Sequence, residues 1–153
     1  PRRVSLALGD VLNHALDFFQ EKLRKRGIVT ERAFEDVPEL VGDRDQLEQV
    51  FLNLFVNAAD AMPSGGTLSV MLTCSSPEEI SVRVRDTGTG IAPEEVQRVF
   101  EPFYTTKARG KGNGLGLLVS RRIVTEHGGT IDLESEEGQG TEFHIRLPTD
   151  PSS

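Results

Sequence analysis

The sequence predicts an α+β protein, a two-layer sandwich in which helices cover one face of a mixed sheet of about five strands. Two features of the pattern lead to this class. Apolar residues recur at helical spacing in several segments, and alternating segments come in pairs joined by short turns. Grouped strands with segregated helices are typical of α+β folds, whose second sheet face is exposed or covered by another domain.

Size and composition limit the possible classes of protein. The chain has 153 residues, of which 37% are hydrophobic and 27% charged, as in a globular domain with a sizeable core. We expect one domain over residues 1–148, monomeric in isolation, and a disordered tail over residues 149–153. The chain does not begin with Met, so we expect it to be a piece of a longer protein. No segment reaches the roughly 20 apolar residues of a membrane span.

Charge and cysteine usage narrow the partners and the compartment. The net charge of −7 argues against nucleic acid as the main partner. An acidic protein that binds an anionic nucleotide needs local basic residues or a divalent metal. Cys74 is the single cysteine, which excludes an internal disulfide and fits a reducing compartment. We therefore expect this domain in the cytoplasm, whether or not the parent protein is membrane-anchored.

The first half of the chain predicts two helices around two strands. Residues 8–26 form an amphipathic pattern that Gly27 ends, and residues 28–34 alternate like a strand. Residues 39–42 form a short second strand or an extended connection. Asp43 then begins a second helix as its N-cap, with Gln46 placed as in a capping box.

The second helix carries two amides beside its core-facing stripe. Its apolar stripe is made of Leu47, Val50, Phe51, Leu54, Phe55, Ala58 and Met62. Asn53 and Asn57 are one helical turn apart at the edge of this stripe, so they lie on one side of the helix. Each is either a structural amide with its hydrogen bonds satisfied or a ligand that faces a cleft.

A carboxylate ends the next pair of strands. Residues 67–74 and 80–86 predict an antiparallel hairpin, and the second strand continues into the segment DTGTGI, residues 86–91. This places Asp86 at the rim of a sheet, beside a backbone that glycines allow to approach a ligand. The carboxylate there can accept a hydrogen bond from an exocyclic amine. The aspartic-protease triplet is the alternative, but it needs a second Asp motif that the chain lacks.

A glycine-rich stretch, residues 100–117, is the most distinctive part of the sequence. Glycines occupy positions 110, 112, 114 and 116, with basic residues between and before them, and a helical pattern follows from about residue 114 to residue 127. Such a loop before a helix N-terminus suits phosphate. Neither the P-loop pattern nor the dinucleotide fingerprint fits. A flexible linker is the alternative, although linkers are polar and here apolar Leu115 and Leu117 alternate with the last glycines.

The remaining segments complete the sheet. Pro93 begins a short helix. Residues 130–135 and 141–147 predict a second hairpin around the turn 136–140, with Glu134 and Glu142 on its solvated face.

Five motifs in this order resemble one family. They are the N box NLFVNAADA, the glycine box DTGTG, the F box FEPFYTTK, the second glycine box GNGLGL and a closing EGQGT. Over about residues 4–147 the chain resembles the catalytic ATP-binding domain of a sensor histidine kinase, of the nitrogen-regulator type, in the superfamily shared with gyrase, Hsp90 and MutL. The resemblance implies the Bergerat ATP-binding fold, with ATP and Mg²⁺ as cofactors.

The resemblance also implies roles for individual residues. Asp86 would accept the adenine amino group, with Thr141 nearby, and Asn57 would ligate Mg²⁺ with support from Asn53. Lys107 would reach the γ-phosphate, as an inference from charge and position, and Phe100 and Phe103 would hold the lid by packing. The complete set of expected nucleotide-binding residues is Asn57, Asp86, Gly88, Gly90, Ile91, Phe100, Thr106, Lys107, Arg109, Lys111, Gly112, Gly114, Leu115, Gly116, Leu117 and Thr141, with Asn53 and Lys107 as catalytic residues.

The chain departs from the family pattern in two ways. Many relatives have a basic residue three positions after the second N-box Asn, where this chain has Asp60. The family's phosphoacceptor His is followed by an acidic residue on a separate dimerisation domain, and none of His14, His127 and His144 fits. The implied function is therefore transfer of the γ-phosphoryl group of ATP to a histidine of that separate domain, with a response regulator as an indirect partner.

Two alternatives remain at this point. ATP hydrolases of the same superfamily have a Glu as general base four residues before the Mg²⁺ Asn, and here that position is Asn53, whose amide cannot take a proton. A degenerate nucleotide-binding module that only mediates interactions belongs to a different class. The intact motifs argue against the module, and Mg²⁺-ADP binding would distinguish it.

Overall fold

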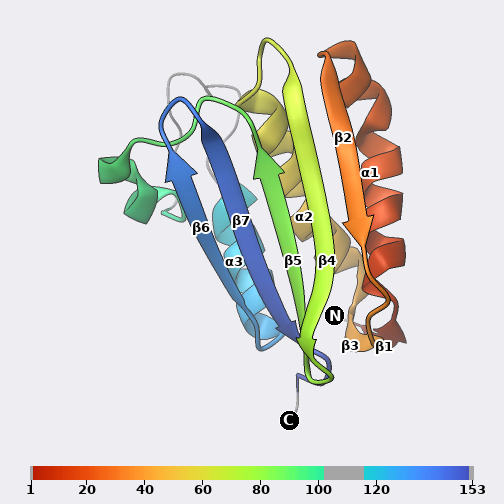
Figure 1. Ribbon diagram of the computed structural model, residues 1–153. Helices are drawn as coiled ribbons and strands as arrows, with labels where there is room; N and C mark the ends of the chain where they lie inside the picture. Colours follow the sequence, from red (N-terminus) through yellow and green to blue (C-terminus); the bar gives the residue numbers. More distant parts are fainter. Residues whose placement is uncertain (1, 102–115, 152–153) are drawn as a thin grey trace.

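A computed structural model describes residues 2–101 and 116–151 of the chain. Its main sheet is flanked by helices on one face only, and the opposite face is open (Figure 1). The predicted two-layer α+β architecture is confirmed. Among the described residues, no helix combines the length and the apolar character that crossing a bilayer requires.

The main sheet has five strands in the order β2-β4-β5-β7-β6. Their bounds are β2 Ile28–Phe34, β4 Gly66–Ser76, β5 Glu79–Asp86, β7 Gly140–Pro148 and β6 Thr130–Glu136. β2 pairs with β4 in parallel and the other neighbours are antiparallel, so the sheet is mixed. Both predicted hairpins, β4–β5 and β6–β7, are confirmed.

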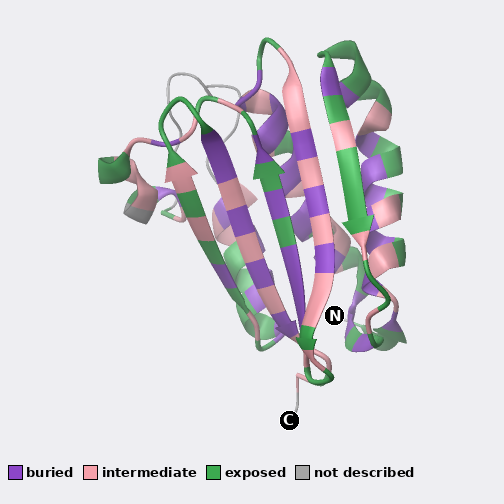
Figure 2. Ribbon diagram, viewed as in Figure 1, coloured by how far each residue is buried: buried purple, intermediate pink, exposed green. Residues whose placement is uncertain are grey.

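The helices bury their apolar stripes against one face of this sheet. They are α1 Leu8–Lys25, α2 Arg44–Asp60 and α3 Gly116–Glu126, with a short 3-10 helix, η1, at Pro93–Arg98. Buried and less buried residues alternate along the central strands, as expected when one face meets helices (Figure 2). Every residue of the stripe predicted for the second helix is buried, including Phe51 and Phe55 at 0% exposure.

One strand was not predicted. β1 (Arg3–Leu6) pairs antiparallel with β3 (Leu40–Asp43) in a separate two-stranded ribbon. Its sequence, RVSL, alternates polar and apolar residues, but the alternation covers only four residues, three of which are exposed in the fold. The ribbon also meets the C-terminal part of the chain, because the Val41 amide donates to the Thr149 carbonyl at 2.9 Å.

A polar junction joins this ribbon to two helices. The Asp43 side chain accepts hydrogen bonds from the Gln46 amide at 3.1 Å and from the Arg2 amide at 2.8 Å, which confirms the predicted N-cap of α2. The Asp43 amide donates to Nε2 of buried His127 at 3.0 Å, and the His127 ring bonds the Ile123 carbonyl through Nδ1 at 2.8 Å. The end of α3 is thereby fixed to the start of α2.

The Asp43 cap predicts an acid-dependent contribution to stability. The Gln46 amide is the main cause that holds the pKa of Asp43 below its ordinary value. Because the folded pKa is the lower one, the stabilisation is fully present above the unfolded value of about 3.9 and is lost as the pH falls through the folded value. Asp43→Ala should therefore lower the free energy of unfolding by about 1–2 kcal/mol at pH 7.

Urea titrations of both proteins between pH 7 and pH 2.5 measure this difference. The gap between wild type and Asp43→Ala should narrow below about pH 4. Asp45→Ala is the control, because Asp45 is a neighbouring carboxylate in the first turn of α2 and is not the residue that caps the helix. A gap that stays constant down to pH 2.5 would contradict the cap as the source of the effect.

Candidate functional site

The site begins with a buried carboxylate at the end of β5. Asp86 is 3% exposed and lies between Leu68 of β4 and Thr141 of β7 in the sheet register. Its Oδ1 accepts a hydrogen bond from the Gly88 amide at 2.9 Å, which turns the chain sharply after the strand. A carboxylate has several acceptor positions, so it can serve more than one hydrogen-bond donor.

The loop after Asp86 is fitted closely between α2 and the β6–β7 turn. The Thr89 amide donates to the Ala61 carbonyl, the C-cap of α2, at 3.0 Å. A Cβ at Gly88 would lie 2.3 Å from that same carbonyl oxygen. Gly90 has a φ of 72°, and a Cβ there would lie 2.2 Å from the Glu136 carbonyl oxygen. The glycines of DTGTG are therefore required by close backbone approach.

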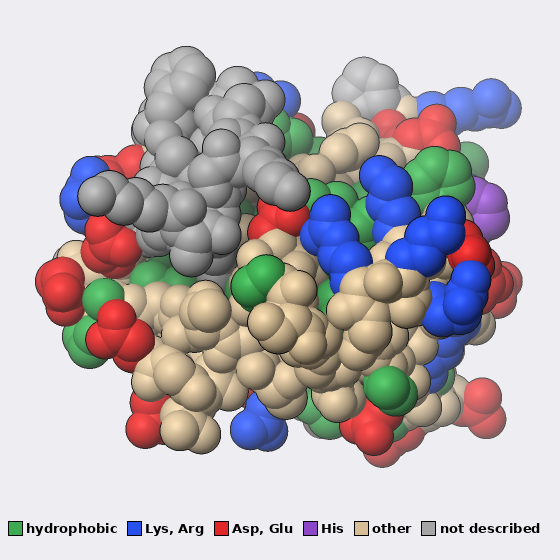
Figure 3. Space-filling view, turned by 90° about the horizontal axis from the view of Figure 1, so that it is seen from above, with side chains coloured by type: hydrophobic (Ala, Val, Ile, Leu, Met, Phe, Trp, Pro, Cys, Tyr) green, Lys and Arg blue, Asp and Glu red, His purple; other side chains and the backbone are tan. Residues whose placement is uncertain are grey.

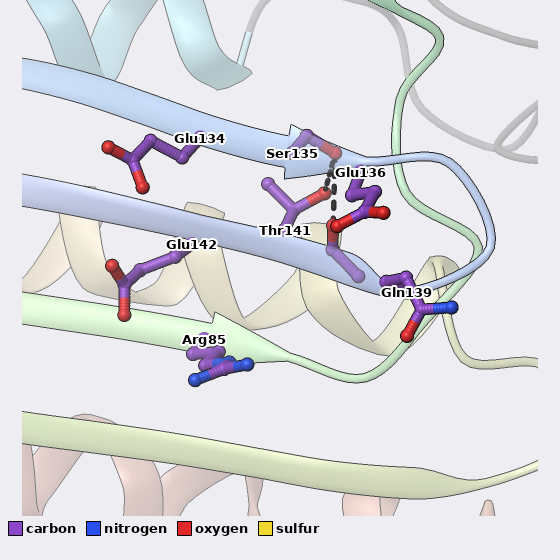
Figure 4. A pocket seen from close by; sticks show the side chains of 8 residues that line it. Arg85, Glu134, Ser135, Glu136, Gln139, Thr141 and Glu142 are labelled. Carbon is purple, nitrogen blue, oxygen red and sulfur yellow. Dashed lines mark hydrogen bonds between the residues drawn. The ribbon is translucent and has the colours of Figure 1, made fainter.

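Ser135 holds the far side of this loop. Its hydroxyl accepts from the Ile91 amide at 2.7 Å, donates to the Gly140 carbonyl at 3.1 Å and lies 2.8 Å from the Thr141 hydroxyl. Figure 4 shows the contacts of Ser135 at the end of β6 and β7. Ser135 has the same strand parity as Ile131 and Leu133, so it lies on the helix side of the sheet with Thr141.

A cavity of about 350 Å³ at the same end of the sheet is lined in part by Ser135, Gly140 and Thr141, and in part by Arg85, Glu134 and Glu142. The last three side chains have the opposite strand parity from Asp86 and Thr141, so they lie on the open face (Figure 4). Part of the cavity lining therefore lies on the open face, whereas Ser135 and Thr141 belong to the helix side of the sheet. The solvated positions predicted for Glu134 and Glu142 are confirmed by their exposed and half-buried states.

Asn53, the first of the two amides of α2, contacts the start of α3. Asn53 Nδ2 donates to the Gly116 carbonyl at 3.1 Å and to the Ser120 hydroxyl at 3.2 Å, while its Oδ1 accepts from Gln49 at 2.8 Å. Asn57 is half-buried one turn further along, four residues before Ala61. The row of amides therefore connects the start of α3 with the end of α2 that holds the Asp86 loop.

The first residues of α3 complete the described part of the site. Gly116 begins the helix beside Asn53. A Cβ added at Gly116 would meet the Asn53 amide at an ordinary contact distance of 3.6 Å. Leu117 is buried in the core. Phe100, half-buried, packs edge-to-face on Phe143 with ring centroids 6.5 Å apart. The Arg121 guanidinium lies 5.4 Å from the centre of the Phe100 ring.

Several predicted residues lie outside the described part of the chain. They are Phe103, Thr106, Lys107, Arg109, Lys111, Gly112, Gly114 and Leu115. The described predicted residues fall into two groups. Asp86, Gly88, Gly90, Ile91 and Thr141 meet at the end of the sheet. Asn53 contacts Gly116 between α2 and α3, with Asn57 on the next turn of α2 and Leu117 next to Gly116 in α3.

Three contributors were missed by the sequence analysis. The Ala61 carbonyl and the Ser120 hydroxyl gave no signal, because their roles depend on which segments meet. Ser135 did leave a trace, since it occupies an inward strand position where Ile131 and Leu133 are apolar. A polar residue at such a position indicates a buried hydrogen-bond partner.

The chemistry of the site fits Mg²⁺ carried by a polyphosphate. The described residues contain no group of three or more His, Cys, Asp or Glu side chains placed to hold a metal ion. Mg²⁺ takes oxygen ligands and usually keeps several waters, with one or two protein ligands and the substrate phosphates completing the shell. The amide oxygen of Asn57 is a ligand of the right kind for that arrangement.

Comparison with known proteins identifies the family. Residues 42–151 match the family described as histidine kinase-, DNA gyrase B-, and HSP90-like ATPase. Sporulation kinase E of Bacillus subtilis (strain 168) is 45% identical over 114 residues, or 74% of this chain and 15% of that protein. Sensor histidine kinase ZraS of Salmonella typhimurium is 39% identical over 142 residues, or 92% of this chain and 30% of that protein.

A solved structure matches over the whole chain. The nucleotide-free catalytic domain of histidine kinase ThkA is 30% identical, with a TM-score of 0.87 over 99% of this chain and 100% of that one. ThkA has also been solved in complex with response regulator protein TrrA, where the match covers 43% of that chain at a TM-score of 0.84. This chain thus belongs to the histidine kinase-, gyrase B- and HSP90-like ATPase family, as a histidine kinase catalytic domain. It spans less than a third of its curated relatives ZraS and sporulation kinase E.

The close contact at Gly88 predicts a steric effect on the site. Gly88→Ala should push the loop away from α2, because the new Cβ would lie 2.3 Å from the Ala61 oxygen. We expect a loss of at least about 2 kcal/mol in the free energy of unfolding, in the range of overpacked positions.

Gly9→Ala is the matched control for this variant. A Cβ at Gly9, within α1, would meet Leu72 at an ordinary 3.5 Å. It should be neutral or stabilising by up to about 1 kcal/mol, since Ala is the better helix former. Urea unfolding of the two variants compares them, and equal stabilities would refute the close fit of the Asp86 loop on α2.

Proposed function

We propose that this domain binds Mg²⁺-ATP in the space bordered by β5, α2 and the start of α3. We further propose that it donates the γ-phosphoryl group to a histidine on a separate dimerisation domain. The observation that carries the proposal is the buried carboxylate of Asp86, held at the strand end by the Gly88 amide. A buried charge is costly unless it serves hydrogen-bond donors, and the adenine amino group is such a donor.

The proposed adenine end of the site is based on two features around Asp86, which are the hydrogen bonds of Ser135 and Thr141 and the closely fitted glycines. Thr141 lies beside Asp86 in the register and shares the Ser135 hydrogen-bond cluster. The closely fitted glycines bring backbone to the same place, where a purine ring would pack against it. Gly88, Gly90 and Ile91 would then line the ring, as the sequence predicts.

The phosphate end would lie between the amides of α2 and the N-terminus of α3. The first amides of a helix carry partial positive charge and have no partner within the helix, so they suit phosphate. Asn57 would hold Mg²⁺, which supplies charge neutralisation to the phosphates when bound. The basic residues Lys107, Arg109 and Lys111 would add positive charge, as predicted from the sequence.

Phosphoryl transfer is favoured over hydrolysis by the state of Asn53. Its Nδ2 is committed to α3 and its Oδ1 accepts from Gln49. An amide with this orientation positions α3 and takes no proton from water, whereas hydrolysis needs a base at that place. Phosphoryl transfer itself depends mainly on positioning and charge neutralisation.

The acceptor must come from outside this chain. His127 is 1% exposed and both its ring nitrogens are hydrogen-bonded, so it is inaccessible to ATP. His14 lies on α1 against Glu48, and His144 lies on the open sheet face, both away from Asn57. We therefore propose a histidine-bearing dimerisation domain of the same kinase as the partner and a response regulator as the next acceptor, in the cytoplasm where ATP is found.

Asp86→Asn tests the adenine assignment. The amide keeps an acceptor for Gly88 but loses the charge, and it turns donors toward the adenine amino group. ATP affinity should fall at least tenfold, in line with a lost charge-assisted hydrogen bond. Asp132→Asn, on the open face beside Arg146, is the control. Isothermal titration with ATP and with adenosine measures both, and unchanged affinity in Asp86→Asn would move the base elsewhere.

Asn57→Ala tests the metal assignment. Without the amide oxygen, ATP affinity should lose most of its dependence on Mg²⁺ concentration, while affinity for adenosine should stay as in wild type. Asn13→Ala, an amide on α1 that accepts from Arg32, is the control. A magnesium response like that of wild type would refute Asn57 as the ligand.

A further inference from the structure

We propose that Arg26, which lies outside all the recognised motifs, supplies a cation to the phosphates of the nucleotide from the end of α1, oriented by Asp60. This inference rests on the proposed function and adds a residue to it. Arg26 Nη1 lies 3.3 Å from Asp60 Oδ1, across 34 residues of sequence. The ion pair joins the end of α1 to the end of α2.

Asp60 belongs to the same face of α2 as the two amides. Asn53, Asn57 and Asp60 are spaced i, i+4 and i+7, so they form one row along the helix. Asn53, at the start of this row, contacts the start of α3, and Asp60, at its other end, contacts Arg26. Asp60 therefore extends the row by one turn beyond the amide proposed to hold Mg²⁺.

A carboxylate in that place is unfavourable for a polyphosphate ligand on its own. The Asp60 carboxylate would repel phosphates held one helical turn away at Asn57, and partial burial weakens the screening of this repulsion by solvent. The Asp60 side chain is 17% exposed and that of Arg26 is 38% exposed. The guanidinium neutralises the carboxylate and stays accessible, which converts an anionic position into one that can receive another anion.

The contact of Arg26 with Asp60 leaves donors available. Only one nitrogen of Arg26 is within bonding distance of Asp60, and this is the one side-chain contact recorded for Arg26 among the described residues. A guanidinium has five N–H donors in a planar fork that suits phosphate oxygens. One carboxylate and one phosphate can therefore be bound together by the same side chain.

The backbone holds Arg26 firmly at this position. Its amide donates to the Lys22 and Leu23 carbonyls as the C-cap of α1. Gly27 follows with a φ of 74° and its carbonyl accepts from the Gly66 amide at 3.4 Å. The turn that ends α1 is thus joined to the turn that leads from α2 into β4, so that the guanidinium is delivered to the end of α2.

The charge distribution agrees with an anion site at this end. The chain carries a net charge of −7, yet the last turn of α1 holds Lys22, Arg24 and Lys25 before Arg26. Figure 3 shows Lys and Arg side chains gathered over this end of the molecule, with an acidic side chain next to them. Cations at a helix C-terminus also interact favourably with the negative end of the helix dipole, but that interaction does not require a partner on α2.

The test separates a phosphate contact from a structural ion pair. Arg26→Ala should weaken binding of Mg²⁺-ATP at least tenfold and leave binding of adenosine within twofold of wild type, since adenosine has no phosphate. Arg26→Lys should recover part of the loss. Arg24→Ala, which removes a cation two residues before the C-cap, where it pairs with Glu21, should change neither affinity. Isothermal titration of the 153-residue chain measures all four proteins.

A second variant moves the cation to α2. Asp60→Arg combined with Arg26→Ala should restore ATP affinity to within about threefold of wild type, because the guanidinium then comes from the row itself. Equal losses of ATP and adenosine affinity in Arg26→Ala, no loss of either, or a double variant as weak as Arg26→Ala would overturn the assignment. If the wild-type chain binds neither ligand, the proposed function itself fails, which is a different result.

Discussion

The hydrogen bond from the Thr89 amide to the Ala61 carbonyl is the contact on which the site depends. It joins the end of the central strand β5 to the end of α2, and so it joins the two layers of the sandwich at one point. Gly88 makes the contact possible because any side chain there would collide with the same carbonyl. Asp86 and Asn57 belong to different layers, and this contact sets the spacing between them.

The same constraint explains why two distant segments, β6 and β7, matter to the site. The Asp86 loop is held on its other side by Ser135, and Gly140 packs its Cα against the Asp86 carbonyl. The loop therefore has backbone neighbours on both sides and little room to move. A rigid acceptor at the floor of a pocket keeps its hydrogen-bond geometry without reorganisation when a ligand binds, which favours affinity.

Much of this arrangement could be predicted from the sequence, because local patterns determine local structure. The stripe of α2, the Asp43 cap and the position of Asp86 at a strand end all follow from spacing and residue type. Contacts between segments do not follow in that way. Strand β1 was missed because its polar and apolar alternation covers only four residues. Ser135, Ser120 and Arg26 were missed because each acts through a partner far away in the sequence.

The β1–β3 ribbon has a consequence for how this unit can be built into larger chains. The first strand pairs with β3, and β3 in turn bonds Thr149, so the first and last described segments of the chain lie close together at the end of the sandwich opposite the Asp86 loop (Figure 1). Neighbouring termini also permit circular permutation and insertion into a host loop with little disturbance of the core. The unit is geometrically suited to be shuffled as an intact module.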